Sequence, residues 1–160
     1  MFGKTIAQYL AFQKYLLLLT VAVGLLRLGV SLAGVPNETA AWLSMNVVLW
    51  ASAVYYGIAV HTRGFGSYKQ ILPLVFFQVA IYHLIAVTGI VLAIAGMQNV
   101  FAAPEYSGPA DAPNQWLHAA SHLTIGMVAA PLVLWAVASF AHWVTRRVVA
   151  ASAPARELSR

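Results

Sequence analysis

The chain has 160 residues, of which 61% are hydrophobic and only 8% are charged, and its formal net charge is +5. This composition excludes an ordinary soluble domain and predicts a single-domain membrane protein. The sequence contains no cysteine, which excludes disulfides, thiolate metal sites and iron–sulfur clusters. The positive residues lie at the ends of apolar runs and form no basic face, so nucleic acid is not an expected partner.

Four apolar segments are long enough to cross a hydrocarbon core, which takes about 20 helical residues. We predict helices over residues 9–34, 40–62, 70–97 and 115–145. The expected fold is therefore an all-α integral membrane protein, built as an antiparallel bundle of four transmembrane helices. Residues 1–150 form this single domain, and residues 151–160 form a short cytoplasmic tail.

The first segment has two interpretations. Lys4 and Lys14 precede a leucine-rich run, and the small residues at 31–33 resemble a signal-peptide cleavage site. Against this, Arg27 interrupts the apolar run and the amino-terminal region is long. We expect a retained first helix, with cleavage as the alternative.

The distribution of charge predicts the orientation in the membrane. The basic residues of the two termini and of the second connection are Lys4, Lys14, Arg63, Lys69, Arg146, Arg147, Arg156 and Arg160. The acidic residues of the other two connections are Glu38, Glu105 and Asp111. Because cytoplasmic loops carry an excess of lysine and arginine, both termini are expected in the cytoplasm and the 98–114 loop outside. The expected location is an inner membrane of the bacterial type.

Polar and small residues follow helical spacing along two of the predicted helices. In the first helix they are Gln13, Thr20, Gly24, Arg27, Ser31 and Gly34, and this face should point into the bundle. In the third helix Ala86, Gly89, Ala93 and Gly96 form a small-residue seam that is expected to receive a neighbouring helix. His61 and His142 are expected at the cytoplasmic interface, and Gln78 is expected to hydrogen-bond between helices.

Five polar residues from four helices are predicted to share the outer half of the bundle. At a rise of 1.5 Å per residue, Arg27, Asn46 and His122 lie roughly 10 Å from the outer helix ends, His118 about 5 Å and His83 about 20 Å. No acidic residue lies inside a predicted span to neutralise Arg27. Its charge is therefore met by a loop acid, helix-end carbonyls, water or a ligand that carries an anion or a carbonyl. For Asn46, an interhelical hydrogen bond is the alternative to ligand binding.

The same residues suggest three kinds of ligand. His118 and His122 are four residues apart on one helix face, but two histidines leave a metal site short of ligands, so the pair is a weak metal candidate. Haem b would need His83 opposite His122 or His118, and their estimated depths differ by roughly 10 Å. A quinone needs only hydrogen-bond donors for its carbonyls and an apolar slot, and it tolerates this spread of depths.

We therefore expect a small membrane subunit that binds a quinone-like or haem cofactor through Arg27, Asn46, His83, His118 and His122. It would work in lipid with other membrane subunits or as a homo-oligomer, and its architecture resembles that of small four-helix subunits of membrane redox complexes. One alternative is an oligomeric channel or carrier for an anion or a small polar solute. Another is a ligand-free scaffold or assembly subunit. Catalysis by this chain alone is not expected, because the spans contain no carboxylate base.

Overall fold

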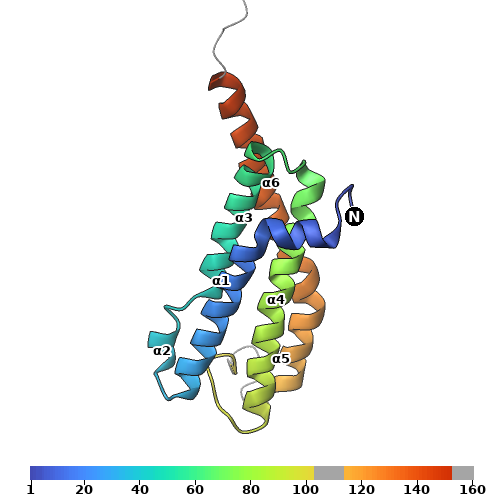
Figure 1. The fold of residues 1–160 in the computed structure, drawn as a ribbon. Helices are drawn as coiled ribbons and strands as arrows, with labels where there is room; N and C mark the ends of the chain where they lie inside the picture. Colours follow the sequence, from blue (N-terminus) through green and yellow to red (C-terminus); the bar gives the residue numbers. More distant parts are fainter. Residues whose placement is uncertain (103–113, 153–160) are drawn as a thin grey trace, which may run out of the picture.

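The computed structural model describes residues 1–102 and 114–152, and every regular element in these ranges is helical (Figure 1). The elements are α1 (Ile6–Leu32), α2 (Asn37–Ala40), α3 (Met45–Thr62), α4 (Tyr68–Ile94), α5 (Gln115–Ser121), the π-helical turn η2 (His122–Gly126) and α6 (Met127–Ser152). Four stretches are long and apolar enough to cross a membrane: Ile6–Leu32, Asn37–Thr62, Tyr68–Ile94 and Gln115–Val149. The predicted all-helical protein with four apolar spans is confirmed. Glu105, Asp111 and most of the predicted 151–160 tail lie outside the described residues.

Polar caps set where the helices begin. Before α1, the Thr5 hydroxyl accepts from the Gln8 backbone N–H at 3.2 Å, while the Gln8 side chain accepts from the Thr5 N–H at 2.8 Å. These paired bonds satisfy two free amide groups at the helix start. As a result α1 begins at Ile6, three residues before the predicted start. An apolar count does not register such polar residues, which is why it began the helix late.

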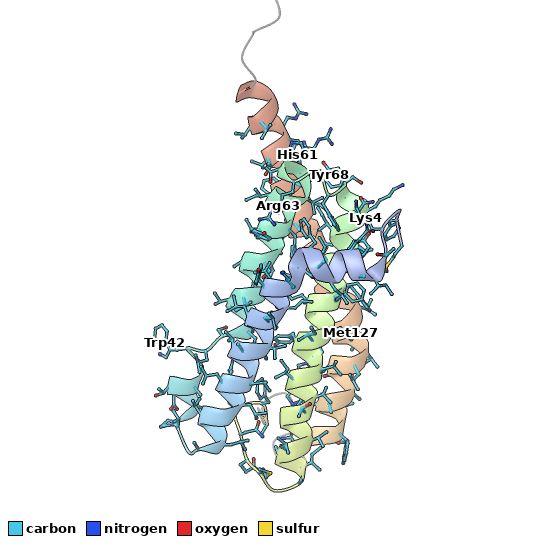
Figure 2. All side chains as sticks on the ribbon, viewed as in Figure 1. Lys4, Trp42, His61, Arg63, Tyr68 and Met127 are labelled. Carbon is cyan, nitrogen blue, oxygen red and sulfur yellow. The ribbon has the colours of Figure 1, made fainter. Side chains whose placement is uncertain are left out.

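The second span is not one continuous helix. We expected a helix over 40–62, but Asn37–Ala40 form the short α2, whose N-cap position is Pro36. Residues 41–44 are not helical, and the Ser44 hydroxyl accepts from the Val47 N–H to start α3. Ser44 is therefore the cap of the spanning helix, because its side chain satisfies an amide that the helix leaves free. The connection points outward, with Trp42 projecting from the bundle (Figure 2).

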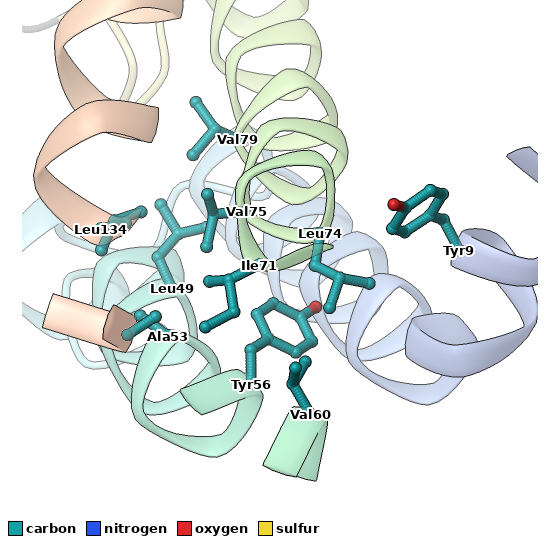
Figure 3. Packing of buried hydrophobic residues seen from close by; sticks show 11 residues of the cluster. Tyr9, Leu49, Ala53, Tyr56, Val60, Ile71, Leu74, Val75, Val79 and Leu134 are labelled. Atoms are coloured by element: carbon teal, nitrogen blue, oxygen red, sulfur yellow. The ribbon is translucent and has the colours of Figure 1, made fainter. Parts of the chain in front are cut away.

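The helices pack around a core at one half of the bundle. There, α3 packs along α6, while α4 packs against α1, α3 and α6. The apolar core there includes Leu49, Ala53, Ile71, Val75 and Leu134 (Figure 3). The lack of a side chain at Gly57 permits the approach of α3 to α6, because a Cβ atom there would collide with the backbone of α6. His142, expected at the interface, is buried in this half and donates from Nδ1 to the Gly57 carbonyl at 3.1 Å, because α6 continues beyond it to Ser152.

A buried polar network ties α1, α3 and α4 together. The Tyr56 hydroxyl lies 2.7 Å from the Gln78 amide oxygen and 3.0 Å from that of Gln13. The Gln78 amide group donates to the hydroxyls of Thr20 and Ser52 at 3.0 and 2.8 Å. The predicted interhelical role of Gln78 is confirmed, and so is the inward polar face of the first helix, except at Gly34, which lies beyond the end of α1 and is exposed. This network fixes the rotation of α1, which in turn directs residues further along the same face toward α4.

Candidate functional site

A cavity of about 730 Å³ lies at the end of the bundle where α2, the start of α3, the second half of α4, α5 and η2 meet. All five predicted binding residues line it: Arg27, Asn46, His83, His118 and His122. Apolar and small residues complete much of the wall: Ala41, Met45, Ala86, Val100, Phe101, Ile125 and Gly126. The structure therefore brings together residues from four separate helices that the sequence grouped only by estimated depth.

Three of these residues form a chain of imidazole rings. His83 Nδ1 lies 2.7 Å from His122 Nδ1, and His122 Nε2 lies 3.3 Å from His118 Nε2. His83 and His118 are 5% and 6% exposed, so the two ends of the chain are buried. His122, in the middle, uses both of its ring nitrogens. The other ring nitrogen of His83, Nε2, is buried and has no hydrogen-bond partner among the described residues.

The ring contact between His83 and His122 differs from the depth estimate, which set these residues roughly 10 Å apart. The estimate counted both positions from helix ends that were taken as level. In the structure α4 extends beyond the start of α5 (Figure 1), so equal counts do not mean equal depth. The long imidazole side chains and the irregular backbone of η2 close the remaining distance.

The π-helical turn η2 places His122 at its first residue and Gly126 at its last. A Cβ atom on Gly126 would lie 2.6 Å from His83 Cε1 and 2.9 Å from His83 Nε2. Only a glycine lets the His83 ring lie against this backbone. Pro131 lacks an N–H and stands within the next helical turns of α6, where it weakens the regular bonding pattern. π-Helical turns of this kind occur frequently at functional sites.

Arg27, on α1, also lines the cavity. Its Nε is buried without a hydrogen-bond partner in the described part of the chain, and its guanidinium carbon lies 5.6 Å from the centre of the Phe101 ring. A cation over an aromatic face is attracted to it, but this contact uses no N–H group. Two of the three loop acids that could pair with Arg27, Glu105 and Asp111, lie outside the described residues, and the third is Glu38 in α2. Within the described part of the chain, the guanidinium has an unused N–H group beside the cavity.

Phe101 reaches the cavity because the chain after α4 folds back over that helix. Asn99 donates to the Gly89 carbonyl at 2.8 Å, and the Val100 N–H donates to the Ser31 hydroxyl at 2.8 Å. A Cβ atom on Gly89 would lie 2.5 Å from the Phe101 ring. The seam of small residues was expected to receive a neighbouring helix. At Gly89 it instead receives Phe101, and so it shapes one wall of the cavity.

The cavity has a buried floor and an exposed side. Met45 and His83 are 1% and 5% exposed, whereas Ile125 is 72% exposed and Asn46 is also exposed. α5 and η2 pack against α4, and α3 packs against α6. The Asn46 side chain makes no hydrogen bond to the residues that the structure describes. Within these residues, Asn46 therefore does not form the interhelical hydrogen bond that was the alternative to ligand binding.

A metal ion does not suit this arrangement. The described residues contain no group of three metal-ligating side chains that could hold one ion. His122 directs opposite nitrogens to its two neighbours, so a single ion cannot bind to all three rings. Metal–imidazole bonds are about 2 Å long, so two axial histidines of a haem would place their nitrogens about 4 Å apart. His83 and His122 are already at 2.7 Å, which leaves no space for an iron between them.

Several residues of this site escaped the sequence analysis. Met45, Phe101 and Ile125 were unremarkable apolar residues, and no sequence signal separates them from other core positions. The sequence could have indicated the irregular turn at Gly126, because this glycine lies inside an apolar helix five residues before a proline. In comparisons with known proteins, no family model, no curated protein and no solved structure matches this chain.

Proposed function

We propose that the protein is an integral membrane subunit that binds a quinone-like molecule in the cavity between α3, α4 and η2. One observation carries this proposal. Two buried donor groups, Arg27 Nε and His83 Nε2, lack partners in the described structure and belong to side chains that line the same cavity. Buried polar groups are almost always hydrogen-bonded. A ligand with acceptor oxygens would satisfy both once the two side chains turn toward the cavity, because neither nitrogen is open to it in the structure.

The chemistry of the wall suits a quinone. A quinone carries two carbonyl oxygens on a flat apolar ring, so it needs donors at its edges and apolar contacts on its faces. Arg27 is always protonated and supplies N–H donors, and the tautomer of His83 protonated at Nε2 supplies another. Met45, Ala86 and Phe101 offer apolar contacts. A volume of about 730 Å³ lies within the usual range for cavities that bind small molecules.

The position of the opening also favours a lipid-soluble ligand. The lining residues Asn46 and Ile125 are exposed, and we infer that the cavity opens beside them to the side of the bundle. An isoprenoid tail would leave through this side into the surrounding lipid. Haem, the other cofactor expected from the sequence, would require His83 and His122 to move apart, and for the pair of His83 and His118 it would have to displace the His122 ring that contacts both. We therefore favour the quinone.

We infer that the four spans alternate in direction and that both termini are cytoplasmic. Residues 63–67, between α3 and α4, form a short connection of the kind that joins antiparallel neighbours. Lys4 and Arg63 lie at the same end of the bundle (Figure 2), opposite Glu38. An excess of positive charge at one end favours the cytoplasmic side, in an inner membrane of the bacterial type.

The two alternatives fit the described residues less well. A channel through one copy would have to cross the apolar core around Leu49, Val75 and Leu134, which fills the bundle beyond the cavity. Transport would then need an assembly of several copies. A ligand-free scaffold should pair its buried polar groups internally, as Tyr56 and Gln78 do, and Arg27 Nε is not paired in this way. Other membrane subunits, or further copies of the chain, remain the partners that we propose.

Quinone extraction and binding test this function. We expect protein purified in native lipids to retain a quinone that organic solvent extracts. For protein in nanodiscs, titration with a short-chain ubiquinone or menaquinone should quench tryptophan fluorescence. Arg27→Gln should weaken binding about 10- to 100-fold, because a hydrogen bond to a charged group contributes about 1.5–3 kcal/mol. The control is His61→Phe, since His61 lies outside the cavity. No extractable quinone and no binding of either compound would refute the proposal.

A further inference from the structure

The imidazole chain of His83, His122 and His118 has the geometry of a proton relay. Each contact joins two ring nitrogens, and the central ring is joined through Nδ1 on one side and Nε2 on the other. A chain of this type conducts only if every inner ring has a partner on both sides. His122 meets that condition, with contacts of 2.7 and 3.3 Å.

With three neutral rings, the chain has two equivalent arrangements of protons. In the first, His118 Nε2–H donates to His122 Nε2, His122 Nδ1–H donates to His83 Nδ1, and His83 is protonated at Nε2. In the second, both bonds are reversed and His118 is protonated at Nδ1. Each neutral imidazole has one N–H and one acceptor nitrogen, so both arrangements satisfy the two contacts.

One proton transfer interconverts these arrangements. A proton binds to His118 Nδ1, the His118 Nε2 proton moves to His122 Nε2, and the His122 Nδ1 proton moves to His83 Nδ1. The proton on His83 Nε2 then leaves. One proton has entered at His118 and one has left at His83, while all three rings are again neutral. Transfer in the opposite direction follows the same steps in reverse.

The surroundings hold the rings in line. The Tyr82 ring lies 5.0 Å from the His83 ring and 6.4 Å from the His122 ring, measured between centroids. Gly126 lies against the opposite side of His83. His118 belongs to α5, near the end of the bundle, whereas His83 and Met45 form part of the buried floor. The chain therefore runs from His118 in α5, near the end of the bundle, to His83 within α4, and its two terminal nitrogens, His118 Nδ1 and His83 Nε2, are both buried.

We propose that His118, His122 and His83 form a proton relay that exchanges protons between the outer end of the bundle and a carbonyl oxygen of the quinone in the cavity. The ligand in this statement rests on the proposed function. Reduction of a quinone to its quinol takes up two electrons and two protons: the relay supplies the proton for one oxygen, and water supplies the proton for the other oxygen. A one-electron redox centre of a partner subunit supplies the electrons, and oxidation of the quinol returns the proton to His83 Nε2.

The first test examines the relay without a quinone. Protein labelled with ¹⁵N at histidine and placed in nanodiscs should show both nitrogens of His83 averaged between the protonated and bare forms. His122→Phe removes the central ring and should leave His83 in one fixed tautomer. The control variant, His61→Phe, should leave the His83 signals unchanged. A single fixed tautomer for His83 in the wild-type protein would overturn the relay, whether or not a quinone binds.

The second test examines the coupling to the ligand. A soluble reductant, dithionite, supplies the electrons to a short-chain ubiquinone bound in nanodiscs, and the rate is measured per bound quinone. In the wild-type protein, D₂O should slow this reduction, because the rate depends on proton transfer. We expect His118→Phe to slow the reduction at least tenfold and to remove the difference between H₂O and D₂O, whereas His61→Phe should match the wild type. An unchanged rate in His118→Phe would overturn the coupling. Failure of the quinone to bind would overturn the proposed function and the coupling, and the first test would still decide on the relay.

Discussion

Gly126 controls how closely His83 can approach η2, and Gly126→Ala tests this directly. An added Cβ atom would lie 2.6 Å from His83 Cε1. Carbon atoms in contact are about 3.5–4.0 Å apart, so the ring must move away by roughly 1 Å. A shift of this size would misalign the 2.7 Å contact between His83 and His122. Overpacking of a buried site costs typically about 1–3 kcal/mol.

The expected result is a loss of about 1–3 kcal/mol in the free energy of unfolding, together with weaker quinone binding. Unfolding is measured by titration with SDS in mixed micelles, and binding by tryptophan fluorescence in nanodiscs. Gly29→Ala is the matched control, because a Cβ atom there meets nothing within 4 Å. It should be neutral or stabilising by up to about 1 kcal/mol. If Gly126→Ala unfolds and binds like Gly29→Ala, the argument that Gly126 positions His83 is wrong.

Three further predictions concern the polar network, the contact between α3 and α6, and the histidine rings. Tyr56→Phe leaves two buried glutamine amides without their shared hydroxyl and should lower the free energy of unfolding by about 1–3 kcal/mol, whereas the exposed Tyr15→Phe should change it little. Gly57→Ala forces α3 away from the Ala138 carbonyl and should destabilise by about 1–3 kcal/mol, with an unchanged unfolding midpoint as the contrary result. Added Zn²⁺ should not raise the unfolding midpoint, because His122 directs its two nitrogens to different rings, and a rise that EDTA reverses would contradict this.

The sequence predicted the helices and the inward face of α1 because these depend on local regularities. Apolar runs of sufficient length predict spans, and the spacing of Gln13, Thr20, Gly24 and Ser31 predicts one buried face. The same spacing placed Arg27 toward the interior. What it could not give is how the helix ends are staggered, since this depends on loops and packing. For that reason the distance between His83 and His122 was misjudged.

The site also depends on irregular backbone, which periodicity cannot reveal. A π-helical turn holds an extra residue, so the face of α6 that follows η2 is rotated relative to a continuous helix over 115–145. The break at residues 41–44 likewise interrupts the predicted helix over 40–62. Each of these departures includes a residue with a specific local contact: the Ser44 hydroxyl caps α3, and Gly126 in η2 lies against the His83 ring.

Both irregular segments border the cavity, and this is informative about its role. Ala41 lies in the break of the second span, and Ile125 and Gly126 belong to η2, and all three line the cavity. α1 and α4, which carry Arg27 and His83, are assigned as continuous helices. Within a membrane, irregular backbone is tolerated where it is buried in protein or lines a cavity, because exposed polar backbone in lipid is costly. The two departures from regular helix therefore form part of the wall of the cavity.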